Sequence, residues 1–195
     1  MVLTIDIGNT TIGIGGFQGN KLLFIEKISS RRPLSDAGYI EKLNMILNKH
    51  GLSAEAFEGS MISSVVPSVT AVFSSALETF LGRKPLILSH KLDLGYEICT
   101  EFPEKVGCDR LADIAGAISR YSLPFVTIDL GTATTFNVLD ENRRFLGGLI
   151  LPGVGTAHRA LLGKTAQLPK GDIHMPAHTI GANTQECITG GMLLG

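Results

Sequence analysis

Short apolar runs separated by turn residues occur in two matching sets along the chain. Each set contains three runs with the length of strands, which predicts a three-stranded meander in each place. The runs cover residues 3–7, 11–16 and 21–28 in the first set, and residues 125–129, 134–140 and 143–151 in the second. This internal repeat predicts two α/β units of related topology.

Apolar residues recur on one side of three further segments, which predicts helices there. The predicted helices cover residues 35–49, 68–81 and 109–121, and additional strands cover residues 60–66 and 85–88. Gly51 and Gly82 follow the first two helices and end them. Residues 89–106 show no regular pattern. We therefore expect a first unit over residues 1–115 and a second unit over residues 116–195.

A turn with an aspartate and a glycine joins the first two strands of each meander. The sequences are Asp6-Ile7-Gly8-Asn9-Thr10 and Asp129-Leu130-Gly131-Thr132-Ala133-Thr134-Thr135. An acid at a strand tip can hold a cation, while glycine lets the backbone approach a phosphate and Thr or Asn groups donate to its oxygens. A strand follows each turn at once, so these are hairpins and not the strand-to-helix loops of Walker or Rossmann sites. One such hairpin is an ordinary turn, but two in matching contexts predict a clamp for a nucleotide polyphosphate.

Composition disfavours several classes of partner. The chain has 195 residues, of which 44% are hydrophobic and 18% charged, and its formal net charge of -1 gives no attraction to nucleic acid or anionic membranes. Cys99, Cys108 and Cys187 form no CxxC pair, and the histidines have no metal-ligand spacing. No apolar run has the length of a membrane span, and no signal peptide precedes the first strand. We therefore expect a cytoplasmic protein that binds neither nucleic acid nor membrane.

Several short segments, taken in order, carry a family resemblance. They are Asp6 to Thr10, Gly107-Cys108-Asp109-Arg110, Asp129 to Thr135, residues 147–153 (GGLILPG), residues 160–169 (ALLGKTAQLP) and Asn183-Thr184-Gln185-Glu186. Together they resemble the type III pantothenate kinases, a family of the actin-like, hexokinase and Hsp70 ATPase superfamily, over essentially all 195 residues. The resemblance implies an α/β fold of duplicated ribonuclease-H-like (actin-like ATPase) units with mixed sheets. The second unit is expected to be incomplete at the C-terminus, because members of the family continue beyond the point matched to Gly195.

The activity that the resemblance implies is ATP-dependent phosphorylation of pantothenate to 4'-phosphopantothenate, the first step of coenzyme A biosynthesis. Mg2+ and a monovalent cation, K+ or NH4+, are the implied cofactors, with Asp6 near the Mg-bound phosphate and Asp129 holding the monovalent cation. The implied ATP and phosphate contacts are Asp6, Gly8, Asn9, Thr10, Gly131 and Thr132. The alternatives are another small-molecule kinase of the same superfamily and a catalytically idle nucleotide-binding regulator.

Asp109 is, by the same resemblance, the general base for the pantothenate hydroxyl, and Gly107 and Arg110 contact the substrate. From sequence position alone, an aspartate that opens a helix is explained fully as its N-cap. The superfamily also serves sugars, acetate, glycerol and protein clients, so its fold alone does not give the substrate. The Gly-x-Asp-Arg and Gly-Gly-x-x-x-Pro-Gly motifs narrow it to pantothenate.

Thr184 matches a subunit-interface motif and is expected to reach the pantothenate carboxylate in the neighbouring subunit, which implies a homodimer with a composite site. The same residues are alternatively a capped helix start. Two positions depart from the family pattern. Residues 100–103 (TEFP) stand where many relatives have Tyr-x-Asn-Pro, and Asn137 stands where relatives commonly have aspartate. We therefore carry over neither a substrate-contacting tyrosine nor a role for that acid.

Overall fold

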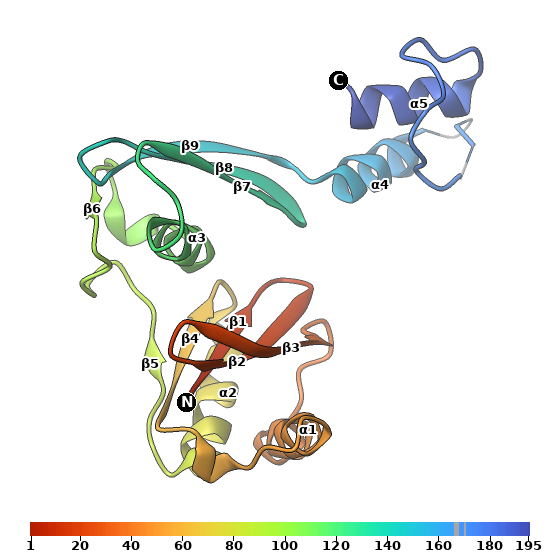
Figure 1. Ribbon diagram of the computed structural model, residues 1–195. Helices are drawn as coiled ribbons and strands as arrows, with labels where there is room; N and C mark the ends of the chain where they lie inside the picture. The colour runs from red at the N-terminus through yellow and green to blue at the C-terminus, as the bar shows by residue number, and fades with distance from the viewer. Residues whose placement is uncertain (166–167, 170) are drawn as a thin grey trace. The chain divides into compact units, whose positions relative to one another are not determined.

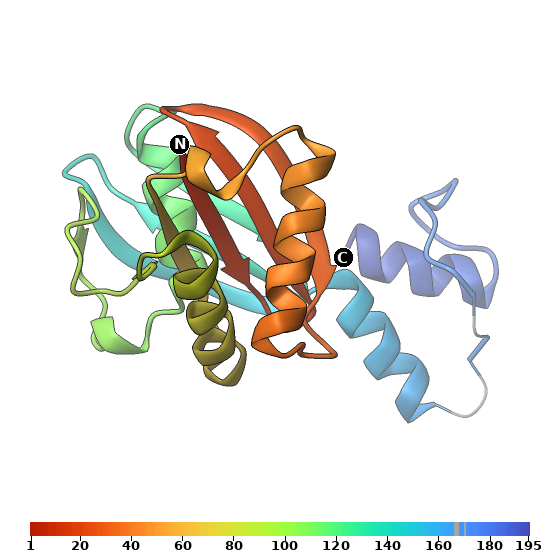
Figure 2. The same cartoon turned by 90° about the horizontal axis from the view of Figure 1, so that it is seen from below.

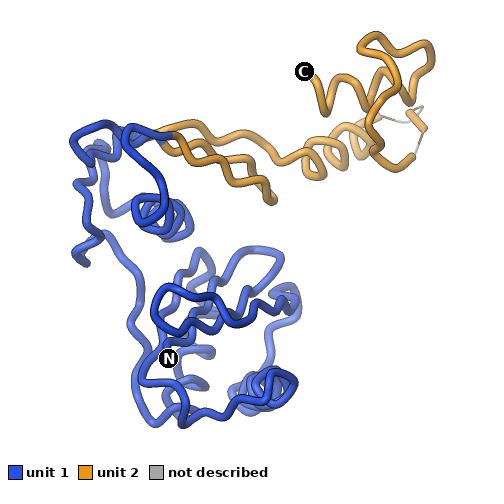
Figure 3. The backbone as a smooth tube through the Cα atoms, viewed as in Figure 1, with its two compact units in different colours: residues 1–125, 138–147 blue, residues 126–137, 148–195 orange. Residues whose placement is uncertain are grey.

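The protein divides into two compact units that alternate along the chain (Figure 3). The computed structural model describes residues 1–165, 168–169 and 171–195. One unit comprises Met1–Phe125 with Val138–Gly147, and the other comprises Val126–Asn137 with Gly148–Gly195. The predicted boundary after residue 115 separates the two repeated meanders along the sequence. The compact units instead group residues that lie close in space, so they do not test that boundary, which stays a prediction.

The first unit contains a five-stranded mixed sheet with the strand order β3-β2-β1-β4-β5 (Figure 1). Its strands are β1 (Val2–Ile7), β2 (Thr11–Gln18), β3 (Lys21–Ser29), β4 (Gly59–Ser64) and β5 (Leu86–Ile87). β1 pairs antiparallel with β2 and parallel with β4. Leu3, Ile5 and Ile7 are buried and alternate with less buried residues, because successive side chains of a strand point to opposite faces. The predicted first meander is confirmed.

Two helices, α1 (Asp36–Lys49) and α2 (Pro67–Leu81), cover one face of this sheet side by side (Figure 2). The Ser35 hydroxyl caps α1 by accepting the Gly38 N–H at 3.2 Å, and Gly82 ends α2 in the left-handed conformation at φ 67°. A short 3-10 helix, η1 (Ala54–Ala56), lies between α1 and β4. The buried core joins sheet and helix residues: Ile5, Ile14, Ile62, Tyr39, Leu43, Phe73 and Leu77. Both helices were predicted to within a residue.

A second, four-stranded sheet has the order β6-β9-β8-β7. Its strands are β6 (Glu97–Ile98), β7 (Phe125–Leu130), β8 (Ala133–Leu139) and β9 (Arg144–Pro152). The 3-10 helix η2 (Pro103–Lys105) and the helix α3 (Cys108–Ile118) lie between β6 and β7 in the chain. Ile114 of α3 packs with Leu139 and Phe145 in a smaller buried core. The short strand β6 falls in the segment that was expected to be irregular. It pairs parallel with the start of β9, and two residues are too few to give a sequence pattern.

The second unit ends with α4 (Val154–Lys164) and α5 (Thr184–Leu193), which are neighbours (Figure 1). The Asn183 side chain caps α5 by accepting the Glu186 N–H at 2.9 Å, and a Glu186 carboxylate oxygen accepts the Ala182 N–H at 2.9 Å. The side-chain cap by Asn183 confirms the alternative interpretation of that segment as a capped helix start. Within the described residues, no helix is both long enough and apolar enough to span a membrane.

Candidate active site

The first aspartate and glycine turn closes the hairpin between β1 and β2. The Gly8 N–H donates to the Thr11 carbonyl at 2.9 Å, and the Ser30 N–H at the end of β3 donates to the Thr10 carbonyl at 3.1 Å. Asn9 is exposed at the tip. The turn is thus fixed by backbone hydrogen bonds on two sides while its tip stays open to solvent.

Asp6 lies exposed one residue before the end of β1. Its neighbours in register are Gly13 on β2 and Ser63 on β4. A Cβ at Gly13 would lie 3.8 Å from the Cβ of Asp6, so the glycine places no side chain beside Asp6 on β2. An accessible carboxylate beside open backbone has the chemistry that a phosphate-bound Mg2+ requires, because Mg2+ is usually held by one or two carboxylates plus substrate phosphates.

The Gly-x-Asp-Arg motif forms the N-terminus of α3. Gly107 is the N-cap residue and Asp109 is the second residue of the helix, so the interpretation of Asp109 as the N-cap is wrong. One carboxylate oxygen of Asp109 accepts the backbone N–H of Arg110 at 2.8 Å. The partial positive charge at a helix N-terminus favours an acidic side chain in the first turn, which suits the position of Asp109.

Gly107 makes room for the Asp109 carboxylate. The backbone at Gly107 has φ -60° and ψ 138°, which any residue adopts, so the glycine is not needed for its conformation. A Cβ at this position would overlap Oδ1 of Asp109 and lie 3.5 Å from its Cγ. The absence of a side chain at residue 107 therefore fixes where the Asp109 carboxylate sits.

The N-terminus of α3 lies beside the end of β4. The Val65 N–H donates to the Ile7 carbonyl at 3.1 Å, and the Val65 side chain would lie 3.7 Å from a Cβ at Gly107. The Cys108 thiol donates to the Leu88 carbonyl at 3.1 Å. Val65 therefore lies between the end of the strand that carries Asp6 and the N-cap of the helix that carries Asp109. Val65 and the structural role of Cys108 were missed from the sequence, where both look like ordinary apolar positions.

Arg110 is partly buried between acidic and aromatic groups. Its guanidinium carbon lies 5.3 Å from the ring centre of Phe145, a cation–π distance. Burial lowers the pKa of Arg110, while the carboxylates of Asp109 and Asp113 raise it. Arginine remains protonated under these conditions, so the side chain supplies a positive charge beside the Asp109 carboxylate.

The second aspartate and glycine turn joins β7 to β8 in the second unit. The Gly131 N–H donates to the Ala133 carbonyl at 2.9 Å. Asp129 is exposed, and its Oδ2 lies 3.6 Å from where a Cβ of Gly131 would stand, so the carboxylate is turned toward the turn. Both aspartates thus precede the glycine of their turn by two residues, as the internal repeat predicted.

The start of α4 packs directly against this second turn. The Gly153 N–H and the Thr156 hydroxyl both donate to the Thr132 carbonyl, at 3.0 and 2.7 Å. A Cβ at Gly153 would overlap the Gly131 carbonyl oxygen and lie 2.9 Å from that of Thr132. Gly153 therefore belongs to the support of the second turn, a role that its motif did not reveal. Ala166 and Gln167 of the ALLGKTAQLP segment lie outside the described residues.

Thr184 is the first residue of α5 and is exposed. The helix is capped by Asn183 and Glu186, so Thr184 is not the capping residue. Its side chain is therefore not required to form the helix.

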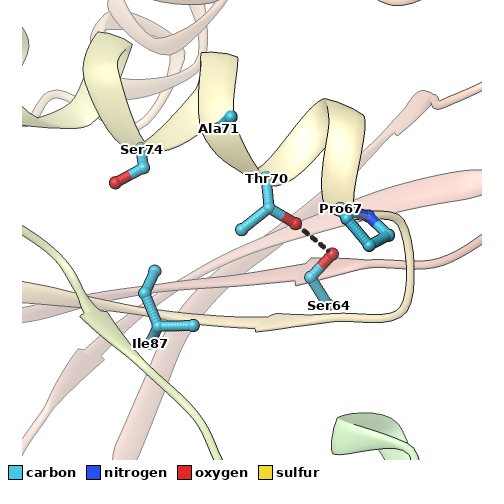
Figure 4. Close-up of a pocket in the computed structure, with 6 residues that line it drawn as sticks. All are labelled: Ser64, Pro67, Thr70, Ala71, Ser74 and Ile87. Atoms are coloured by element: carbon cyan, nitrogen blue, oxygen red, sulfur yellow. Dashed lines mark hydrogen bonds between the residues drawn. The ribbon is translucent and has the colours of Figure 1, made fainter.

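A surface hollow of about 450 Å³ lies beside α2 (Figure 4). Its lining residues are Ser64, Pro67, Thr70, Ala71, Ser74 and Ile87. The Thr70 hydroxyl donates to Ser64 at 2.6 Å, and Ser64 accepts the Val66 N–H at 3.0 Å, so these polar atoms already serve the start of α2. No predicted site residue lines the hollow, and we assign it no part in the chemistry.

Metal-binding clusters of the usual kind are lacking in the part of the chain that the structure describes. No group of three or more His, Cys, Asp or Glu side chains there could hold a metal ion. A cation shared between one carboxylate and a substrate phosphate needs no such cluster.

Comparison with known proteins decides the family. The family model described as Type III pantothenate kinase matches residues 2–195. The chain belongs to the type III pantothenate kinase family. A type III pantothenate kinase of Thermomicrobium roseum is 36% identical over 195 residues, which cover all of this chain and 75% of that protein. One of Bifidobacterium animalis subsp. lactis is 38% identical over 192 residues, which cover 98% of this chain and 76% of that protein.

A solved structure supports the fold. The crystal structure of a conserved putative Baf family transcriptional activator from Campylobacter jejuni matches with a TM-score of 0.56 and 18% identity, over 97% of this chain and 72% of that one. At this identity the likeness concerns the fold alone. The expected α/β class with mixed sheets is confirmed, and the chain has the actin-like ATPase fold of its kinase family.

Proposed function

We propose that this chain transfers the γ-phosphoryl group of ATP to the primary hydroxyl of pantothenate, giving 4'-phosphopantothenate in the first step of coenzyme A biosynthesis. One structural observation carries the chemistry, namely the Asp109 carboxylate held over Gly107 at the N-terminus of α3. This helix end lies beside Val65, whose N–H donates to Ile7 at the end of β1, the strand of the first phosphate turn. The family match over residues 2–195 supports the substrate.

Asp109 acts in this proposal as the general base. A kinase must orient an alcohol in line with the terminal phosphate and accept its proton as the new bond forms. The hydrogen bond from Arg110 N–H leaves the second carboxylate oxygen of Asp109 as a proton acceptor. The guanidinium of Arg110, oriented by Phe145, provides a positive charge for the substrate. Gly107 lets the carboxylate and the substrate approach the backbone.

The two turns hold the nucleotide in this proposal. Gly8 provides close backbone approach, and Asn9 and Thr10 donate to phosphate oxygens in the first turn. Gly131 and Thr132 do the same in the second. Mg2+, when bound, neutralises charge on the phosphates. The accessible Asp6 carboxylate beside Gly13 fits such an ion.

A monovalent cation, K+ or NH4+, is a further part of the proposal, with Asp129 as its ligand. The support is the turned-in Asp129 carboxylate, whose Oδ2 lies beside Gly131. An acid next to a phosphate-binding turn repels the phosphate unless a positive charge lies between them.

A homodimer and a cytoplasmic location complete the proposal. Thr184 would contact the pantothenate of the partner subunit, and its support is an exposed position at the start of α5 that the helix cap does not use. The cytoplasmic location is supported by free thiols at Cys99, Cys108 and Cys187. Light scattering measures the assembly, and a monomer with full activity would contradict the composite site.

Direct measurement of ADP formation tests the function. Purified chain is supplied with ATP and Mg2+ and with pantothenate or one of a panel of sugars, in potassium buffer and in buffer with a bulky organic cation. We expect that pantothenate is phosphorylated and that the sugars are not, and the mass of the product confirms the phosphorylation. Faster turnover with a sugar would show that the sugar is the substrate instead of pantothenate. Nucleotide binding without any turnover would favour an idle regulator. ADP is detected without pyruvate kinase, because that coupling enzyme itself requires potassium.

A further inference from the structure

Thr135 on β8 carries a buried hydroxyl that has no partner. The residue is only 7% exposed, and among the described residues no group forms a hydrogen bond with its Oγ1. Buried hydroxyls in folded proteins are normally hydrogen-bonded, because an unpaired one loses its interactions with water without replacement. An exception therefore indicates an atom or ion that completes the group.

The register of the hairpin places this hydroxyl beside Asp129. The backbone hydrogen bond from Gly131 to Ala133 sets that register at the turn. The side-chain hydrogen bond from Asn137 Nδ2 to Thr127 Oγ1, 3.0 Å long, fits the same register. Counting back from that pair puts Thr135 directly opposite Asp129. Directly opposite residues of an antiparallel pair share a face, with Cβ atoms about 4.5–5.5 Å apart.

The carboxylate of Asp129 and the hydroxyl of Thr135 thus lie on one face next to the turn, yet they are not hydrogen-bonded to each other. Oδ2 of Asp129 is turned toward Gly131 instead. In the first hairpin Asp6 faces Gly13 on β2 and has no side chain opposite it there, although it is in register with the buried Ser63 on β4. The second turn alone therefore has a hydroxyl oxygen and a carboxylate as opposite partners of one hairpin.

We propose that Thr135 Oγ1 is a second protein ligand for the monovalent cation at Asp129, an inference that rests on the proposed cation site. Hard cations bind oxygen ligands. A neutral hydroxyl adds a ligand without adding a second negative charge, which suits an ion of single charge. The bound ion would also complete the otherwise unpaired oxygen of Thr135.

Cation binding can be measured apart from turnover through protein stability. A ligand at concentration L that binds only the folded state stabilises it by RT ln(1 + L/Kd), so fitting the rise in unfolding temperature gives the Kd, the concentration at which half of the folded protein is bound, here called the potassium midpoint. The unfolding temperature is recorded against potassium concentration with Mg2+ and a nonhydrolysable ATP analogue, and tetramethylammonium keeps the ionic strength constant. The variants are Thr135→Val, which removes the hydroxyl at constant shape, Thr135→Ser, which retains it, and Asp129→Asn. Ser60→Ala is the matched control, since Ser60 is another buried hydroxyl without a partner but pairs with Leu3 far from both turns.

We expect Thr135→Val to raise the potassium midpoint about tenfold or more, as is typical for loss of a supporting group at a metal site. Thr135→Ser and Ser60→Ala should keep the wild-type midpoint. Without potassium, Thr135→Val should unfold at the same or a higher temperature than wild type, because it removes an unpaired buried hydroxyl. A purely structural role would instead lower that temperature and leave the midpoint unchanged. If Thr135→Val does not fold, Thr135→Ala removes the same oxygen and takes its place.

Two outcomes overturn the inference in distinguishable ways. If potassium stabilises wild type, Asp129→Asn abolishes the effect and Thr135→Val leaves the midpoint unchanged, then Thr135 is not a ligand while the proposed cation site stands. If wild type and Asp129→Asn show the same lack of response to potassium, the cation site itself is wrong and the inference fails with it. Turnover of pantothenate in that buffer then shows whether the kinase function survives without the cation.

Discussion

Replacing Gly107 with alanine should inactivate the enzyme while leaving its fold intact. The new Cβ would overlap Oδ1 of Asp109 and lie 3.7 Å from the Val65 side chain, an ordinary contact. The backbone does not have to move, because φ and ψ at this position suit alanine. The atom that must move is the end of a flexible side chain, namely the carboxylate that we assign as general base.

The effects on stability and on rate can be separated by magnitude. A glycine-to-alanine change at a compatible backbone position stabilises by about 0.4–1 kcal/mol through the unfolded state. Alanine is a poorer N-cap than glycine, at a cost of about 0.5 kcal/mol or more. Loss of the bond between Arg110 N–H and Asp109 costs less than the ~1.5–3 kcal/mol typical for a charged acceptor, because water replaces the carboxylate. We expect a net loss of about 1 kcal/mol, or ~2–4 °C in Tm, against a kcat reduced on the order of 10²-fold or more.

Gly116→Ala is the matched control for this prediction. It makes the same substitution in the same helix, and a Cβ at Gly116 meets nothing within 4 Å. The control should keep wild-type kcat and gain up to ~1 kcal/mol of stability, because alanine is the better helix former. ADP formation and thermal unfolding are measured for both variants. A Gly107→Ala enzyme with kcat within about threefold of wild type would refute the assignment of the carboxylate position above Gly107 as the reactive one.

Three further predictions concern other groups. Asp109→Asn should lower kcat by ~10² to 10⁴ with little change in Tm, and near-normal ADP formation would show that Asp109 is not the base. Gly153→Ala should displace the second turn, because the new Cβ would overlap the Gly131 carbonyl oxygen, and nucleotide titration should therefore show weaker ATP binding. An unchanged ATP affinity would show that the packing of α4 against this turn does not matter for ATP binding. Burial raises the pKa of Asp140, but hydrogen bonds from the Arg144 backbone and side chain outweigh burial and hold that pKa below its usual value. Its stabilisation is therefore present at neutral pH and lost as pH falls below the ordinary value of ~3.9, so the Tm difference between wild type and Asp140→Asn should shrink there, and a constant difference would refute the linkage.

The regular elements could be predicted from the sequence where the local pattern and the tertiary packing agree. Helix α1 has a capping serine and an apolar stripe, and α2 ends at a glycine with positive φ. These bounds are therefore encoded in the local sequence. β6 could not be predicted, because it exists only through pairing with β9, a contact distant in sequence. Helix α4 has none of its residues buried and was not expected. Without a buried face, the apolar periodicity that signals a helix is weak.

The candidate site was predictable in its residues but not in its contacts. The two aspartate and glycine turns and the Gly-x-Asp-Arg motif are visible as residue types. The reason for Gly107 is not visible, because it depends on where the Asp109 side chain folds. Cys108 shows the same limit, since its bond to the Leu88 carbonyl joins it to a residue twenty positions earlier, just after β5. Sequence patterns show which functional groups are present, whereas tertiary contacts determine where those groups lie and what they bind.

The two turns show how a repeated backbone can acquire different chemistry. Each places an aspartate two residues before the turn glycine, on the strand that enters the hairpin. In the first hairpin Gly13 lies opposite Asp6, and on the other side Asp6 is in register with Ser63 of β4, whose buried hydroxyl has no hydrogen bond within the described residues. In our proposal Thr135 lies opposite Asp129 and gives a monovalent cation a direct oxygen ligand, whereas Asp6 holds a phosphate-bound Mg2+, which keeps several of its waters. The proposal therefore assigns the two halves of the repeat to different cations.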